Sequence, residues 1–273
     1  PMSTPPTATP TPTSEPKYSV DIKITSIPDS WTILQPFFTK YITVFGINIF
    51  ATEETADHKI IHAANVLAQY LDNDANGSPD NIEVLEELVN NNATLIMSKD
   101  DNQMESLWDD FPDSVHDLFD NSLGVQDLYG SETAPYNGFD ASLEEVLHLI
   151  THHGYSKVYP DVFGEQYDSE IANYMDTARG GRFAQVPFRY PSSAWYSYDD
   201  HTCDYSCMVT EYFYWALTSL LGAQVDPDRC EEIEHEWKLC SPWQVRDTDT
   251  NVYDLLTDTQ YSLPSVIPNG YYI

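Results

Sequence analysis

Apolar residues recur along the chain at two different spacings, and these spacings predict both strands and helices. The segment 39–52 is dense in β-branched and aromatic residues, which predicts a strand or a hairpin. In the segment 57–71 apolar residues return every three or four positions, as on one face of a helix. Further helices are predicted over 82–91, 142–153 and 207–222, and further strands over 18–27, 93–98 and 125–135. The order predicts an α+β fold with a small mixed sheet and several helices.

The first residues, PMSTPPTATPTPTSEP, differ in composition from the rest of the chain. Their proline and threonine content predicts a disordered linker over 1–16. We see no second linker and no internal repeat, so we expect one domain over 17–273. No apolar run approaches the roughly 18 residues that a membrane-spanning helix needs. The linker lacks the basic start and apolar middle of a signal peptide, and we interpret the chain as the mature form of a secreted protein.

The charge of the chain excludes two classes of partner. Its 273 residues include 44 acidic and 12 basic side chains, which gives a formal net charge of −32. Such a chain offers little to neutralise the phosphates of nucleic acids or of anionic membranes, so we expect neither as a partner. The charge fits a secreted protein in salty or calcium-rich surroundings, because screening and bound cations reduce self-repulsion. The sequence does not indicate an oligomeric state.

All the cysteines of the chain lie in one short region. A C-x3-C pair followed by two more distant cysteines could form a zinc site, but no C-x2-C spacing is present. An even number of cysteines in an acidic, tyrosine-rich chain favours two disulfides and an extracellular location. Three connectivities are open. The cysteines are Cys203, Cys207, Cys230 and Cys240.

The stretch DNDANGSPDNIE matches the pattern of an EF-hand-type calcium loop at every ligand position. Calcium prefers six or more oxygen ligands, and Gly77 permits the sharp turn between them. Pro79 occupies the position through which paired EF-hand loops contact each other, so we expect a single structural calcium site. The alternative is an acidic surface turn. The predicted ligands are Asp72, Asp74, Asn76, Ser78, Asp80 and Glu83.

The stretch SLEEVLHLITHHGY predicts a helix with a metal-binding stripe. At about 100° per residue, His148 and His152 fall on the same side as Glu145, opposite the apolar face, and Glu144 lies beside them. Two imidazoles at i and i+4 can reach one zinc ion. An H-x3-H pair is a weak motif taken alone, and the alternative is a solvated face with Glu–His pairs.

The order of elements over residues 39–155 resembles that of the zincin metallopeptidases. In that fold an edge strand binds the substrate backbone just before the active-site helix begins, and VQDLYGSETAP stands in that place. In gluzincin-type members a downstream helix supplies a glutamate as third zinc ligand. The resemblance implies this role for Glu211, which stands alone as an acidic residue in a strongly apolar segment. His201 is the alternative third ligand.

One position departs from the zincin pattern. The family places its general base directly after the first histidine, where this chain has Leu149. If the protein is a hydrolase, Glu145 or Glu144 must activate the water. Glu145 could instead be a fourth ligand, and the metal site would then be closed and structural. We therefore expect a secreted, calcium-stabilised zinc peptidase, with a non-catalytic metal-binding matrix or binding protein of zincin-like fold as the alternative.

Other histidines carry weaker signals. His58 and His62 repeat the H-x3-H spacing in the segment 57–71, where we expect them to cap or pack. Glu232 and His235 repeat the E-x-x-H spacing, as in di-iron carboxylate bundles. Such bundles need four long helices, and the first half of this chain is too rich in predicted strands.

Overall fold

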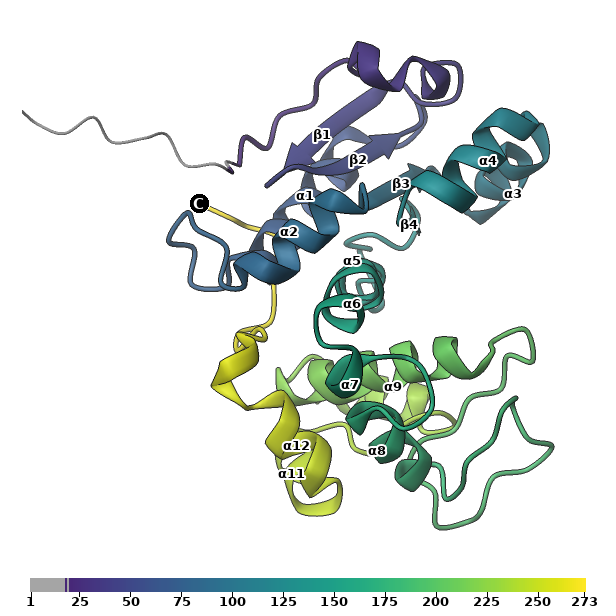
Figure 1. The fold of residues 1–273 in the computed structure, drawn as a ribbon, viewed down its shortest axis with the longest axis vertical. Helices are drawn as coiled ribbons and strands as arrows, with labels where there is room; N and C mark the ends of the chain where they lie inside the picture. Colours follow the sequence, from purple (N-terminus) through teal and green to yellow (C-terminus); the bar gives the residue numbers. More distant parts are fainter. Residues whose placement is uncertain (1–17, 19) are drawn as a thin grey trace, which may run out of the picture.

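The computed structural model describes residues 18 and 20–273, and the predicted linker over 1–16 lies outside the described residues (Figure 1). The described residues contain one sheet of four strands in the order β1-β2-β3-β4. β1 and β2 are antiparallel, whereas β2, β3 and β4 are parallel. The mixed sheet and the surrounding helices confirm the predicted α+β fold. The strands are β1 (Lys40–Val44), β2 (Ile47–Ala51), β3 (Thr94–Ser98) and β4 (Val125–Tyr129).

A tight turn joins the first two strands. Phe45 and Gly46 have φ angles of 50° and 92°, and the flanking residues Val44 and Ile47 pair across the hairpin. Positive φ at both central residues is typical of the two-residue turns that match the twist of a hairpin. The predicted strand over 18–27 forms only the isolated bridges Val20–Val44 and Thr25–Tyr41.

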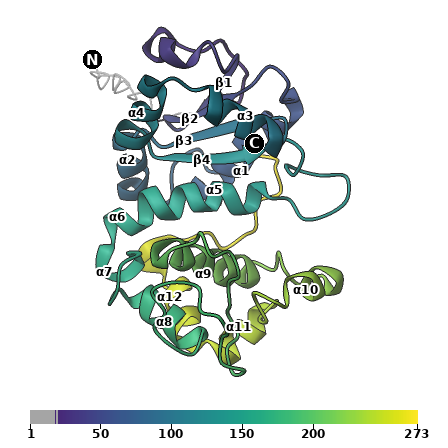
Figure 2. The ribbon, with the colours of Figure 1, turned by 90° about the vertical axis from the view of Figure 1, so that its right-hand side faces the viewer.

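The helices cover both faces of the sheet and build a second layer beneath it (Figure 2). Alternation along β2 explains the two covered faces: Ile49 belongs to the larger apolar core and Phe50 to the smaller one. The helices are α1 (Asp57–Leu71), α2 (Ile82–Asn90), α3 (Asp101–Asp110), α4 (Asp113–Ser122), α5 (Ser142–Ile150), α6 (Ser156–Val158), α7 (Pro160–Phe163), α8 (Glu170–Ala178), α9 (Tyr205–Leu220), α10 (Pro227–Ile233), α11 (Pro242–Thr248) and α12 (Thr250–Leu256), with 3-10 turns η1 (Asp29–Leu34) and η3 (Thr259–Tyr261).

Helix α5 is the element that joins the two layers. It contacts β3 and β4 on one side and α9 on the other (Figure 2). The sequence predicts that this helix ends at Gly154, but it continues through a π-helical turn, η2 (Thr151–Tyr155), into α6. Gly154 serves packing instead, because a Cβ there would lie 2.8 Å from Val84 of α2. The histidine helix is therefore held between the sheet and the lower helical layer.

Two disulfides confirm the prediction from the cysteine count. Cys203 pairs with Cys207 and Cys230 with Cys240, and the described residues include no free cysteine. Disulfides persist in oxidising compartments, so this pairing indicates an oxidising environment. Among the described residues, no helix combines the length and the apolar character needed to cross a membrane.

Candidate metal centre

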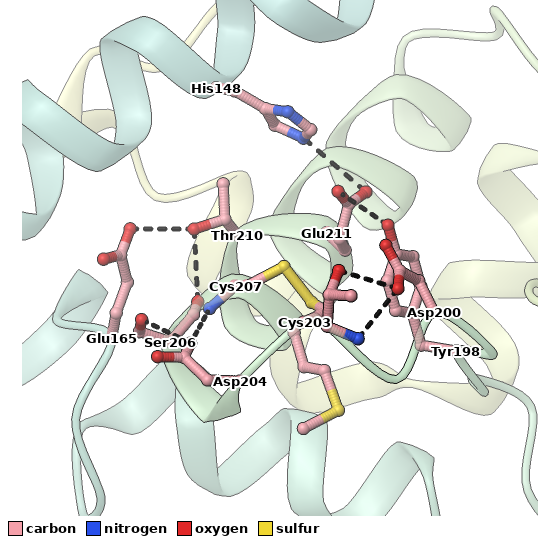
Figure 3. The surroundings of a disulfide bond; sticks show 12 residues. His148, Glu165, Tyr198, Asp200, Cys203, Asp204, Ser206, Cys207, Thr210 and Glu211 are labelled. Carbon is pink, nitrogen blue, oxygen red and sulfur yellow. Dashed lines mark hydrogen bonds and ion pairs between the residues drawn. A yellow bond between two sulfur atoms is a disulfide. The ribbon is translucent and has the colours of Figure 1, made fainter. Parts of the chain in front are cut away.

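His148 lies at the contact of α5 and α9, where it faces the carboxylate of Glu211 (Figure 3). Its Nε2 atom is 3.7 Å from Glu211 Oε2, and its Nδ1 atom is 3.6 Å from Glu145 Oε2. The residue is buried, with 7% of its surface exposed. Each nitrogen of the ring therefore faces a different glutamate, one from its own helix and one from the layer below.

The Nε2 atom of His148 is buried without a hydrogen-bond partner. A buried polar atom left without a partner costs about 1–3 kcal/mol, so such atoms are uncommon in folded proteins. A metal ion held between this nitrogen and the carboxylate of Glu211 would satisfy both groups. The donor chemistry on this side of the ring thus fits a transition metal.

The carboxylates around His148 make the site strongly electronegative. Burial, together with the charge of Glu211, raises the pKa of Glu144 to about 8. Burial also raises the pKa of Glu211. Burial lowers the pKa of His148, but the charges of Glu211 and Glu145 outweigh it and raise the value to about 10. The site therefore favours a positive charge, which a proton on His148 or a bound cation can supply.

Glu211 projects from the second turn of α9 and is nearly buried, with 12% of its side chain exposed. Tyr198 donates a hydrogen bond of 3.2 Å to its Oε1 atom. The start of α9 is fixed by its N-cap, where Asp204 accepts from the backbone N–H of Cys207. The Cys203–Cys207 disulfide encloses this same turn (Figure 3). These contacts place Glu211 opposite His148. Glu211 is the residue that the zincin resemblance implies as third ligand.

His152 lies in the π-helical turn and has a partner that the sequence did not suggest. Its Nδ1 atom is 2.7 Å from Glu165 Oε2. Glu165 comes from the loop between α7 and α8, and Thr210 of α9 donates a 2.8 Å hydrogen bond to its Oε1 atom. No spacing in the sequence relates Glu165 to His152, because the short helices α6 and α7 separate the two residues.

The three predicted zinc ligands line one pocket of about 310 Å³, but they are not one of the groups of described residues whose ligand atoms all lie within 4.8 Å of one another. The pocket opens between β4, the histidine helix and the start of α9. The predicted base Glu145 contacts the Nδ1 edge of His148 instead, where Gln126 of β4 donates a 2.6 Å hydrogen bond to it. The lining residues are Val125, Gln126, His148, His152, His153, Ser206, Cys207, Thr210 and Glu211.

A second arrangement of ligand atoms lies within α5 itself. One ligand atom from each of Glu144, Glu145 and His148 lies within 4.8 Å of the others. This set contains two carboxylates and one imidazole from a single helix. A metal bound there would make Glu145 a ligand. The site would then be the closed, structural one that the sequence offers as the alternative to a catalytic site.

The predicted calcium loop brings three of its carboxylates together. Ligand atoms of Asp72, Asp74 and Asp80 lie within 4.8 Å of one another. Gly77 has a φ of 86°, as the sharp turn requires, and its N–H donates to Asp72 at a distance of 2.7 Å. Glu83 lies exposed in the first turn of α2, outside that group of three. An oxygen-rich set of this kind fits the ligand preference of calcium.

The two remaining predicted calcium ligands shape the loop. The side-chain oxygen of Asn76 accepts the N–H of Ser78 at 2.9 Å, and the N–H of Asn76 donates to Asp74 at 3.2 Å. Both residues are exposed. The 12-residue loop thus adopts a compact turn in which the three aspartates, but not Glu83, face one another.

The other candidate histidines lie apart from this pocket. His201 and His58 are exposed. His62 contacts Asp140 at 2.6 Å, and Asp140 also accepts from Ser142 at the start of α5. His62 therefore supports the start of the histidine helix, in keeping with its predicted packing role.

Comparisons with protein-family models, with curated proteins and with solved structures each gave no match. The geometry of the two clusters and the chemistry of their side chains therefore provide the basis for a function.

Proposed function

We propose that the protein is a secreted, metal-dependent hydrolase of peptide bonds. The observation that carries this proposal is the buried Nε2 atom of His148, which lacks a hydrogen-bond partner and faces Glu211 across 3.7 Å. His152 lines the same pocket. Two imidazoles and a carboxylate are a frequent ligand set for catalytic zinc. The two disulfides, in an acidic chain, support a secreted location.

His148, His152 and Glu211 are the residues that would hold the zinc ion. Zinc in such a site lowers the pKa of a bound water and polarises the carbonyl of a substrate. Tyr198 contributes by holding the Glu211 carboxylate through its hydroxyl group. The raised pKa values of Glu144 and Glu211 reflect the excess negative charge that a divalent cation would compensate.

The predicted base is Glu145, whose carboxylate lies on the Nδ1 side of His148, away from the Nε2 atom that would bind the metal. This residue lies one helical turn before His148, and the amide of Gln126 holds its carboxylate at 2.6 Å. Glu144 is the alternative base, and its pKa of about 8 suits proton exchange near neutral pH.

The substrate backbone would lie along β4. This strand is at the edge of the sheet and packs against α5, and its residues Val125 and Gln126 line the pocket. An extended peptide can hydrogen-bond to such an edge as an additional strand.

A non-catalytic role is the second candidate, and two observations favour it. Leu149, at the position where zincins carry their base, is fully buried in the core. Glu144, Glu145 and His148 also converge closely enough to hold an ion in a closed site. In this case the metal would support the contact of α5 with its neighbours, and the protein would act as a calcium- and metal-binding matrix or binding protein.

Elemental analysis and a peptide-cleavage assay on the same variants separate the two functions. We expect about one zinc per purified chain, lost in His148→Ala together with cleavage of a mixed peptide library. In Glu145→Gln, loss of cleavage with retained zinc identifies a base, whereas loss of zinc identifies a ligand. Glu231→Gln, an exposed position on α10, is the control. Bound zinc without any cleavage by the parent protein supports the non-catalytic function. A chain free of transition metal rejects the hydrolase and leaves a calcium-binding protein.

A further inference from the structure

His152 meets the carboxylate of Glu165 through one nitrogen of its ring. Both carboxylate oxygens lie close to Nδ1, at 2.8 Å for Oε1 and 2.7 Å for Oε2. The Nε2 atom has no such contact within the described residues. His152 nevertheless lines the pocket together with His148 and Glu211. The ring is thus anchored at one nitrogen and available at the other.

Glu165 is itself held from a second side. Thr210 donates a hydrogen bond of 2.8 Å to Oε1, and the same hydroxyl lies 3.2 Å from the carbonyl of Ser206 one turn earlier on α9 (Figure 3). The Glu165 side chain is 10% exposed, so water competes little for the carboxylate. Thr210 immediately precedes Glu211 in α9. The Glu165 carboxylate therefore connects His152 to the helix that carries the proposed third ligand.

A carboxylate in this position selects the tautomer of the imidazole. Because an ionised carboxylate only accepts hydrogen bonds, Nδ1 must carry the proton that it receives. In the neutral ring Nε2 then keeps its lone pair, which is the form that binds a metal ion.

We propose that Glu165 is a positioning residue of the metal site. It fixes His152 in the Nδ1–H tautomer. Through its hydrogen bond from Thr210, it also fixes the position of the ring relative to Glu211. The inference rests on the proposed function, because it treats His152 as a metal ligand. The competing explanation is a structural contact that ties the loop after α7 to the π-helical turn. Both explanations predict a loss of stability when Glu165 is replaced, so stability does not distinguish them.

The tautomer of His152 in the metal-free protein provides the first test. Long-range ¹⁵N–¹H correlation spectra at pH 8.5 should show a protonated Nδ1 and an unprotonated Nε2 in the parent chain. Glu165→Ala should shift the ring toward the Nε2–H tautomer, and Thr210→Val should shift it partly. Thr210→Ser, which keeps the hydroxyl group, should restore the parent spectrum. A predominantly Nε2–H or doubly protonated His152 in the parent chain would overturn the proposal.

Zinc affinity provides the second test and does not depend on catalysis. Competition with a chelator should give a dissociation constant about 10–100-fold higher for Glu165→Ala than for the parent, the range seen for outer partners of ligand histidines. Glu170→Gln, an exposed carboxylate paired with Tyr174 on α8, should leave the constant unchanged. Unchanged affinity in a folded Glu165→Ala variant would assign the residue a purely structural role. Failure of the hydrolase proposal alone would leave parent zinc binding and the tautomer result intact.

Discussion

The hydroxyl group of Tyr272 donates a hydrogen bond to the buried carboxylate of Asp72. The contact joins the predicted calcium loop to a residue 200 positions later in the chain. Neighbouring contacts extend it, because side-chain oxygens of α1 and its following turn accept backbone N–H groups of the terminal segment. Asn65 accepts from Tyr272, Gln69 from Gly270, and Asn73 from Val266. The end of the chain is thus bound along one face of α1.

Removing the Tyr272 hydroxyl should therefore lower stability. We expect Tyr272→Phe to reduce the free energy of unfolding by about 1–2 kcal/mol, because the buried Asp72 carboxylate loses one of its donors. Urea denaturation in the presence of a chelator measures the change without a contribution from calcium. Tyr271→Phe is the matched control, because that neighbouring side chain is 77% exposed. Equal stabilities of the two variants would show that the contact contributes nothing.

Calcium should stabilise the parent chain through the loop 72–83. Binding to the folded state alone adds about 2.7 kcal/mol at a calcium concentration 100 times the dissociation constant. The double variant Asp74→Asn/Asp80→Asn should lose most of this gain, since it removes two of the three convergent carboxylates. Thermal unfolding with calcium and with chelator measures the difference.

Asp109→Asn controls for the general effect of removing negative charge, because Asp109 is an exposed residue of α3. A calcium response of the double variant equal to that of the parent would reject the loop as the binding site. A response to magnesium of the same size would point to general charge screening instead.

Local patterns in the sequence were sufficient for the fold class and the disulfide content. The helix over 57–71 and the strand over 93–98 follow from side-chain periodicity, which is a local property. Two disulfides follow from an even cysteine count, although their pairing does not. The stripe of His148 and Glu145 follows from helical geometry, and the structure places their side chains 3.6 Å apart.

Contacts made by loops and by the end of the chain leave no periodic pattern in the sequence. Glu165 approaches His152 through a turn between two short helices, so its role depends on the path of the backbone. Asn65 and Gln69 have the spacing of an ordinary solvated helix face, yet both bind the terminal segment. Gly154 has the sequence signature of a helix end, but its position is decided by the packing of α2. Tertiary packing determined each of these features.

His153 should make the fold sensitive to mild acid. Burial, together with the neighbouring His152, lowers the pKa of its ring to about 4. The packing is close, since a Cβ at Gly124 would lie 2.7 Å from the ring. In the unfolded chain a histidine has a pKa of about 6.5, so between these values the unfolded state binds more protons than the native state. This contribution to stability is therefore complete above about pH 6.5 and is lost as the pH falls toward 4.

Replacement of His153 by Gln should remove this part of the pH dependence. A single proton contributes a slope of at most about 1.4 kcal/mol per pH unit, so the unfolding free energy of the parent should fall more steeply between pH 6.5 and 4 than that of the variant. Carboxylates such as Glu144 titrate in both proteins, and comparison of the two slopes isolates His153. Urea denaturation at half-unit pH steps, in chelator, measures them. His201→Gln replaces an exposed histidine and should keep the parent slope of unfolding free energy against pH. Parallel curves for the parent and His153→Gln would show that His153 is protonated equally in the folded and unfolded states.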